Sequence, residues 1–171
     1  MDLNEHYLQQ AIDTHRNLGI ENTKFKHSDL LGIGEIDSDI IGSAQLLNIL
    51  EFDKGKQFME DCFKTAKKAV FAHSLFTERP LEYEIKVHDQ SVNKSISESI
   101  HSVVNMKKMA ERHGFVMTIN KEFVMDIDLP DVFDGRGTYT VKAENGKRLQ
   151  FTDVLYCPWR FLYFEKGVDN G

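Results

Sequence analysis

The chain has 171 residues, of which 41% are hydrophobic and 28% charged, and its formal net charge is −6. These values fit one domain that is long enough to bury a substantial core. The negative charge, with basic residues scattered along the chain, argues against nucleic acid as a partner. No apolar run approaches the roughly 20 residues of a membrane span, which excludes a transmembrane protein.

Neither a targeting signal nor a cysteine motif is visible in the sequence. The first residues, MDLNE, lack the basic region and apolar region of a signal peptide. Cys62 and Cys157 lie far apart and form no CxxC or Cys/His cluster. We therefore expect a cytoplasmic protein with two reduced cysteines and no metal site.

The first part of the chain predicts a helix and then a short strand. Residues 5–18 place Leu8, Ala11, Ile12 and Leu18 on one helical face, and Gly19 is a natural helix end. Residues 23–27 alternate in polarity, which is typical of a strand, and residues 30–38 are expected to form a loop.

The stretch DSDIIGSAQLLNILEF, residues 37–52, organises the rest of the chain. Residues 39–42 predict a buried strand that stops at Ser43 and Ala44, and a helical run is expected over 45–50. Small residues at the carboxyl end of a strand leave room for a ligand, and open α/β sheets bind ligands at that edge. Tight packing of Ser43 and Ala44 is the alternative interpretation.

Alternating helices and strands continue through the middle of the chain. Asp53 is expected to cap a second helix, with Phe58, Met59, Cys62, Phe63 and Ala66 on its inner face, and residues 69–73 predict a buried strand. This order indicates an α/β fold with a mostly parallel sheet and flanking helices.

The second half of the chain is expected to add a cap and an antiparallel hairpin. Residues 74–95 are interpreted as an irregular cap insertion with a possible strand over 83–87, followed by a helix over 98–113 and a strand over 115–119. Residues 138–142 and 148–156 flank Asn145-Gly146, a strong hairpin signal, and residues 160–165 predict a last strand.

Several of these stretches, in this order, resemble the class I S-adenosylmethionine-dependent methyltransferases. The matching stretches are Asp2-Leu3-Asn4, LGIENTKF at 18–25, Ser28-Asp29-Leu30, DSDIIGSAQLLNILEF at 37–52, AKKAVF at 66–71 and AERHGF at 110–115. The resemblance covers the chain except for the insertion and the hairpin, and it implies a Rossmann-like α/β domain over residues 1–171.

The resemblance also implies a cofactor, S-adenosyl-L-methionine, and residues that bind it. Asp2, with Leu3, looks like the strand end whose carboxylate accepts hydrogen bonds from the ribose hydroxyls, and Ser28-Asp29-Leu30 looks like the turn that contacts adenine. Ser43 and Ala44 would line the cofactor and the substrate. A solvated acid at Asp2 and a turn residue at Asp29 are the alternatives.

The candidates for acid–base chemistry are few. His73 ends the strand over 69–73 and is the candidate catalytic base, although a structural histidine is the alternative. His88 and His101 are weaker candidates in or near the cap. Glu78 and Arg79 are candidates for substrate binding, with a solvated loop pair as the alternative.

One departure from the family pattern concerns its first strand and glycine-rich turn. These would precede Asp2, and Gly32-Ile33-Gly34 does not replace them, because it follows the expected third strand. Three explanations stay open: a truncated chain, a chain completed by another chain or a second copy, and a non-catalytic relative.

The resemblance implies an enzyme that transfers a methyl group to a small-molecule acceptor. The chain has neither the Asn/Asp-Pro-Pro-aromatic run of nucleic-acid amino-methylating enzymes nor a basic tract, which favours the hydroxyl or amine of a sugar, lipid or metabolite. The insertion and the hairpin would shape the acceptor pocket. A non-catalytic regulatory subunit and another Rossmann-type nucleotide binder, such as a dehydrogenase, are the alternatives.

Overall fold

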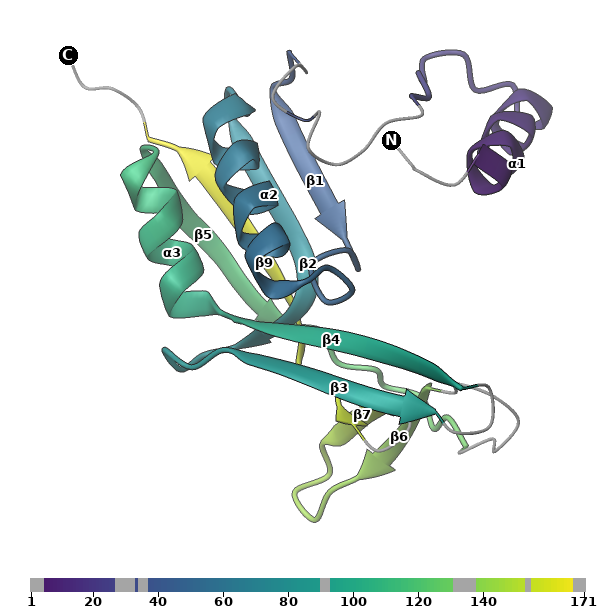
Figure 1. Cartoon of the computed structure of the whole chain (residues 1–171), viewed down its shortest axis with the longest axis vertical. Helices are drawn as coiled ribbons and strands as arrows, with labels where there is room; N and C mark the ends of the chain where they lie inside the picture. The colour runs from purple at the N-terminus through teal and green to yellow at the C-terminus, as the bar shows by residue number, and fades with distance from the viewer. Residues whose placement is uncertain are drawn as a thin grey trace.

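A computed structural model describes residues 5–26, 33, 37–89, 93–130, 138–152 and 155–167 of the chain. The described elements form a central sheet, a long outlying hairpin and a second, small sheet (Figure 1). In chain order they are α1 (Glu5–Asn17), β1 (Ile40–Ala44), α2 (Phe52–Thr65), β2 (Ala69–Thr77), β3 (Tyr83–Asp89), β4 (Lys94–Ser102), α3 (Val103–Arg112), β5 (Phe115–Glu122), β6 (Thr138–Lys142), β7 (Arg148–Thr152), β8 (Leu155–Tyr156) and β9 (Trp159–Lys166).

The central sheet has the strand order β1-β2-β9-β5. Strand β1 pairs in parallel with the first half of β2, from Ile40 opposite Ala69 to Ala44 opposite His73. Strand β9 is antiparallel to both β2 and β5, so β1, β2 and β5 all run in the same direction. The predicted α/β sheet with flanking helices is confirmed, and among these four strands β9 is the reversed one.

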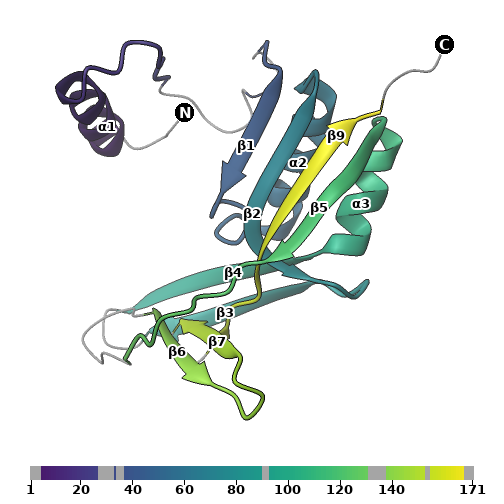
Figure 2. The same cartoon turned by 180° about the vertical axis from the view of Figure 1, so that it is seen from behind.

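Helices α2 and α3 cover the same face of this sheet, as the two opposite views show (Figures 1 and 2). The main core lies between them and the sheet, and Phe63, Met59, Val70, Leu162 and Phe164 are among its fully buried members. Each such side chain contributes roughly 1.5–3 kcal/mol by leaving water. On the opposite face, Ile40 of β1 and Ile119 of β5 stay about half exposed.

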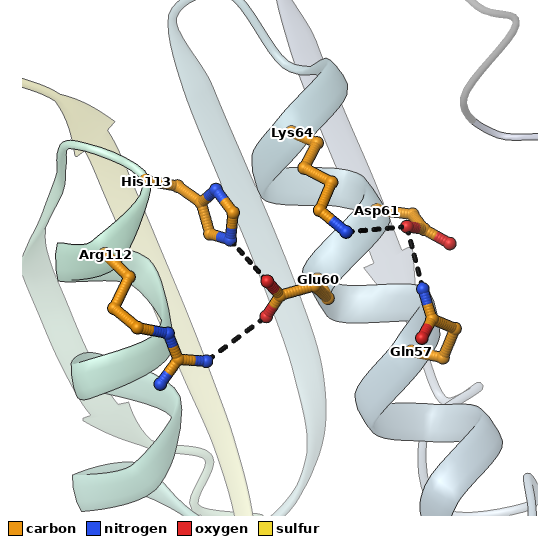
Figure 3. A network of polar contacts seen from close by, with 6 residues as sticks. All are labelled: Gln57, Glu60, Asp61, Lys64, Arg112 and His113. Atoms are coloured by element: carbon orange, nitrogen blue, oxygen red, sulfur yellow. Dashed lines mark hydrogen bonds and ion pairs between the residues drawn. The ribbon is translucent and has the colours of Figure 1, made fainter.

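Polar contacts join α2 to the end of α3 (Figure 3). Glu60 accepts a hydrogen bond from His113 Nε2 at 2.6 Å and one from Arg112 at 3.3 Å. Burial alone would raise the pKa of Glu60, but the hydrogen bond and positive charge of His113, with the charge of Arg112, together lower it. Within α2, Asp61 is bound by both Gln57 and Lys64.

Strand β2 extends beyond the central sheet and carries the outlying hairpin. Its last residues, Phe76 and Thr77, pair in parallel with His101 and Ser102 of β4. Strands β3 and β4 form an antiparallel hairpin, and β6, β7 and β8 form the small sheet. Both views place the small sheet beside the β3–β4 hairpin (Figures 1 and 2).

Most of the predicted elements are confirmed. Helix α1 matches the predicted helix over 5–18, although none of its residues is buried and it lies apart from the sheet in both views (Figures 1 and 2). Strands β1, β2, β5 and β9 lie where strands were expected. The Asn145-Gly146 turn joins β6 and β7, with Gly146 at a φ of 80°.

Three predictions for the segments before and after β1 are wrong. Residues 23–26, the described part of the strand expected over 23–27, form no strand, and no described strand pairs with them. Residues 45–50 form a turn instead of a helix, because Gln45 has a φ of 56° and its N–H bonds to the carbonyl of His73 at 2.7 Å. Helix α2 begins at Phe52, so Asp53 lies in its first turn rather than at the cap.

The boundaries of the expected insertion are also wrong. Residues 74–77 continue β2, and most of the remainder is the regular β3–β4 hairpin, which includes the strand expected over 83–87. Residues 98–102 belong to β4, and the helix expected from residue 98 begins at Val103. Ser102 caps this helix by accepting a hydrogen bond from Asn105 N at 3.2 Å. None of the described helices has the length and apolar content needed to cross a membrane.

Candidate functional site

The carboxyl end of β1 lies against the middle of β2, which continues to Thr77. Ala44 lies opposite His73 in the last step of their parallel ladder, and Ser43 lies opposite Ala72. The left-handed Gln45 then turns the chain away from the sheet. In open α/β sheets the carboxyl end of such a strand is where ligands bind.

Ser43 and Ala44, predicted as cofactor-lining residues, face opposite sides of β1. Ser43 lies on the buried side with Ile41, and Ala44 lies on the exposed side with Gly42. The Ser43 side chain is only 5% exposed, and its Oγ has no hydrogen-bond partner among the described residues. A buried hydroxyl without a partner costs about 1–3 kcal/mol. Ser43 and Ala44 therefore do not line one surface together, and Ala44 alone lies on the exposed side of the strand.

His73, predicted as a candidate base, lies among aromatic rings. It stacks on Phe161 at 4.3 Å between ring centroids and also contacts Trp159 and Phe123. Its Nε2 is buried and has no partner among the described residues. Burial lowers the pKa of His73, which favours a neutral imidazole that can accept a proton.

The other predicted cofactor ligands lie outside the described part of the chain. These are Asp2, Leu3, Ser28, Asp29 and Leu30. Their roles in binding ribose and adenine stay predictions.

A buried polar cluster under the turn after β1 was missed by the sequence analysis. Asn48 donates to Glu98 Oε2 at 2.9 Å and accepts a bond from Ser74 Oγ at 3.5 Å. Ser99 of β4 adds two bonds, from its N–H to the Asn48 carbonyl and from its Oγ to the Leu50 carbonyl. The turn therefore fills the space between β1 and β4, which both pair with the same edge of β2. The signal available was a single asparagine within the apolar run LLNIL.

His101 of β4 also contacts the turn after β1. It is fully buried, stacks on Phe52, and hydrogen-bonds through Nε2 to the Leu47 carbonyl at 3.3 Å. Burial lowers its pKa. His88 lies on the β3–β4 hairpin and pairs with Ser95. Neither histidine approaches the carboxyl end of β1 through any contact that the structure shows.

A cleft of about 440 Å³ lies farther along β2, beyond His73, and is lined by residues of the central sheet, the long hairpin and the small sheet. It begins at the carboxyl ends of β2 and β5 and at the start of β9. Its lining residues are Phe76, Thr77, Glu78, Arg79, Tyr83, Ile100, Glu122, Lys147, Tyr156, Pro158 and Arg160. The expected insertion and hairpin thus both contribute to one cleft, and Glu78 and Arg79, predicted to bind substrate, both line it.

Two ion pairs cross the cleft. Arg160 donates to Glu78 and to Asn120, each at 2.8 Å. Lys147 donates to Glu122 at 2.6 Å, and this hydrogen bond raises the pKa of the lysine. Among the described residues, no group of three or more His, Cys, Asp or Glu side chains could hold a metal ion.

Comparison by sequence identifies no relatives. No protein-family model matches the chain, and no curated protein matches its sequence.

Comparison by structure gives many matches, and the three described here have low sequence identity. A SAM-dependent methyltransferase from Methanosarcina mazei matches with a TM-score of 0.59 and 8% identity, over 98% of this chain and 81% of that chain. Magnesium protoporphyrin IX methyltransferase from Synechocystis PCC 6803, solved with bound SAM, matches with a TM-score of 0.55 and 12% identity. That match covers 97% of this chain and 57% of the enzyme.

A third match is mitomycin 7-O-methyltransferase, with a TM-score of 0.53 and 10% identity, over 96% of this chain and 40% of that enzyme. The chain therefore spans only about half the length of some of these enzymes. Identities this low establish the fold and not the activity. The chain has the fold of the class I S-adenosylmethionine-dependent methyltransferases.

Proposed function

We propose that the carboxyl end of β1, with the adjoining middle of β2, binds S-adenosyl-L-methionine and that the chain takes part in methyl transfer to a small molecule. The observation that carries this proposal is the small-residue strand end Gly42-Ser43-Ala44, which lies opposite Phe71, Ala72 and His73 in the parallel ladder of a methyltransferase-type sheet. The cleft, proposed to hold the acceptor, begins at Phe76 on the same strand β2, three residues beyond His73.

The described residues at the strand end fit the cofactor. Ser43 offers a buried hydroxyl without a partner, and Ala44 leaves space on the exposed side. Asp2 and Asp29 remain our proposed ligands for ribose and adenine. The bound cofactor would supply a methyl group on a sulfonium, so this chain's residues need only orient the acceptor and exclude water.

The cleft is suited to a small-molecule acceptor. A volume of about 440 Å³ lies within the range of ligand pockets. Two proteins that share the fold are named for small acceptors, magnesium protoporphyrin IX and mitomycin. His73 is the proposed base, because it is held neutral and its Nε2 is free of partners among the described residues.

Catalysis by this chain is proposed together with a completing segment or partner chain, such as a second copy. The chain spans 57% of the porphyrin enzyme and 40% of the mitomycin enzyme. A non-catalytic regulatory subunit with the same fold is the alternative, and cofactor binding separates the two.

Isothermal titration with S-adenosylmethionine tests the proposal. We expect saturable binding, with Ala44→Leu weakening it at least about tenfold, because a branched side chain would fill the space at the strand end. Ile40→Leu is the matched control, since Ile40 is exposed at the opposite end of the same strand. No heat and no rise in melting temperature at about millimolar cofactor would reject the proposal and favour the regulatory alternative.

A further inference from the structure

The cleft beside the sheet edge has both aromatic and charged walls. Tyr83 and Tyr156 line it and are 46% and 42% exposed, which leaves much of each ring accessible. Phe76, Ile100 and Pro158 add apolar surface. Exposed aromatic faces of this kind bind flat, apolar ring systems.

The cationic side chains that line the cleft outnumber the carboxylates. Three cationic side chains line it, Arg79, Lys147 and Arg160, against two carboxylates, Glu78 and Glu122. Glu78 is bound to Arg160 and Glu122 to Lys147. Arg79 is left without a carboxylate partner among the described residues, so the cleft has one cationic group in excess.

Arg79 is held in place at its backbone. Its N–H donates to Thr77 Oγ1 at 3.2 Å, and its carbonyl accepts a bond from Ser102 Oγ at 2.7 Å. The long side chain is therefore attached to a fixed point at the end of β2. A guanidinium presents five N–H donors that match the oxygens of a carboxylate or phosphate.

Arg160 offers a second, more rigid set of donors. Its side chain is 13% exposed and is fixed by Asn120 and Glu78, bonds that use two of its five N–H groups. Its other N–H donors have no partner among the described residues, and Arg160 lines the cleft. A cationic ligand would gain no carboxylate here, because both acids are already paired.

We propose that this cleft binds a small molecule that carries an aromatic ring system and an anionic group, with Arg79 and Arg160 holding the anion and Tyr83 and Tyr156 contacting the ring. The anion is a carboxylate, a sulfonate or a phosphate. Its role as the methyl acceptor rests on the proposed function, whereas binding itself does not. In a chain with a net charge of −6, a local excess of positive charge is what would draw an anion to this place.

Fluorescence titration of the full chain with two matched probes tests the proposal. The anionic probe is 8-anilinonaphthalene-1-sulfonate, and the neutral probe is N-phenyl-1-naphthylamine, which has the same rings without the sulfonate. We expect the anionic probe to bind more tightly. Arg79→Gln should weaken it about tenfold and leave the neutral probe within about twofold, because only a charge-assisted contact is lost.

Two further variants separate the cleft from general effects. Arg16→Gln on α1 removes an arginine that does not line the cleft and should leave both probes unchanged. Tyr156→Ala removes an aromatic wall and should weaken both probes.

Three results would overturn the proposal: no binding of either probe, equal affinity for both, or the same loss from Arg79→Gln and Arg16→Gln. The titrations contain no S-adenosylmethionine, so their outcome is independent of the proposed function. Anion binding without cofactor binding would keep the site and remove its role as an acceptor site. Cofactor binding without anion selectivity would keep the proposed function and reject the anion site.

Discussion

The pKa of the His73 imidazole is lowered by burial among residues that are distant in the sequence. The rings that enclose it come from β9 and from the residue after β5, about 50 to 90 positions along the chain. The sequence predicted His73 at a strand end, but β2 continues to Thr77. The aromatic surroundings of His73 depend on tertiary packing that no local pattern reveals. The same holds for Asn48 and Glu98, which are hydrogen-bonded across 50 residues.

Acidification should destabilise the protein through His73. Its pKa is lowered in the folded state, so the unfolded chain binds the proton more readily, and stability is lost as the pH falls below about 6.5. We expect His73→Phe to change the free energy of unfolding by less than about 1.5 kcal/mol at neutral pH, since ring volume is kept.

The free energy of unfolding of His73→Phe should rise relative to that of the wild type as the pH falls. Urea unfolding at about pH 7.5 and about pH 5 measures this difference. His101, whose pKa is also lowered by burial, is present in both proteins and cancels in the comparison. Two unfolding free energies that fall in parallel would contradict this account of His73.

At the scale of elements, local patterns predicted most of the helices and strands. The Asn-Gly turn and the apolar face of α2 are local signals, and both are confirmed. The run from Gln45 to Leu50 looks helical, but Gln45 is bonded to β2 and the turn is fixed by β4. Residues 98–102 look helical with those that follow, yet they pair with β3 and β2. Pairing between strands overrode local preference in both cases.

The close contact between Gly55 of α2 and His101 of β4 leads to a second prediction. Gly55 lies in α2, and a Cβ added there would be 3.1 Å from the Cε1 and Nε2 atoms of His101. Alanine is favoured over glycine within a helix by about 1 kcal/mol. His101 has little freedom to move, because it is stacked on Phe52 and bonded to the Leu47 carbonyl.

We therefore expect Gly55→Ala to lower the free energy of unfolding by about 1 kcal/mol, the clash outweighing the helix gain. In a His101→Ala background the clash is absent, and the same substitution should be stabilising. Denaturant unfolding of the four proteins in this cycle gives the coupling. Stabilisation by Gly55→Ala in both backgrounds would show that the His101 ring shifts to accommodate the added Cβ, and it would contradict the predicted clash.

At the scale of the whole molecule, the α/β class of the fold followed from the alternation of strands and helices in the sequence, while the ligand edge at the small residues of β1 stays a prediction. For the cleft, the sequence predicted which segments contribute to it but not how its charged side chains pair. The insertion and the hairpin were expected to shape an acceptor pocket, but the ion pairs that leave Arg79 in excess join residues from β2, β5, β9 and the β6–β7 turn. Such a balance of charge depends on the assembled chain and is not visible in any one segment.

Mapping of S-adenosylhomocysteine by amide chemical shifts tests the central claim most directly, because it detects weak binding and reports where it occurs. We predict that titration of the labelled chain shifts a connected set of amides at the carboxyl end of β1 and the adjoining middle of β2, including Ser43, Ala44, Gln45 and His73, while the tip of the β3–β4 hairpin stays unchanged. Shifts that are absent at about millimolar ligand, or that gather away from these residues, would contradict the account.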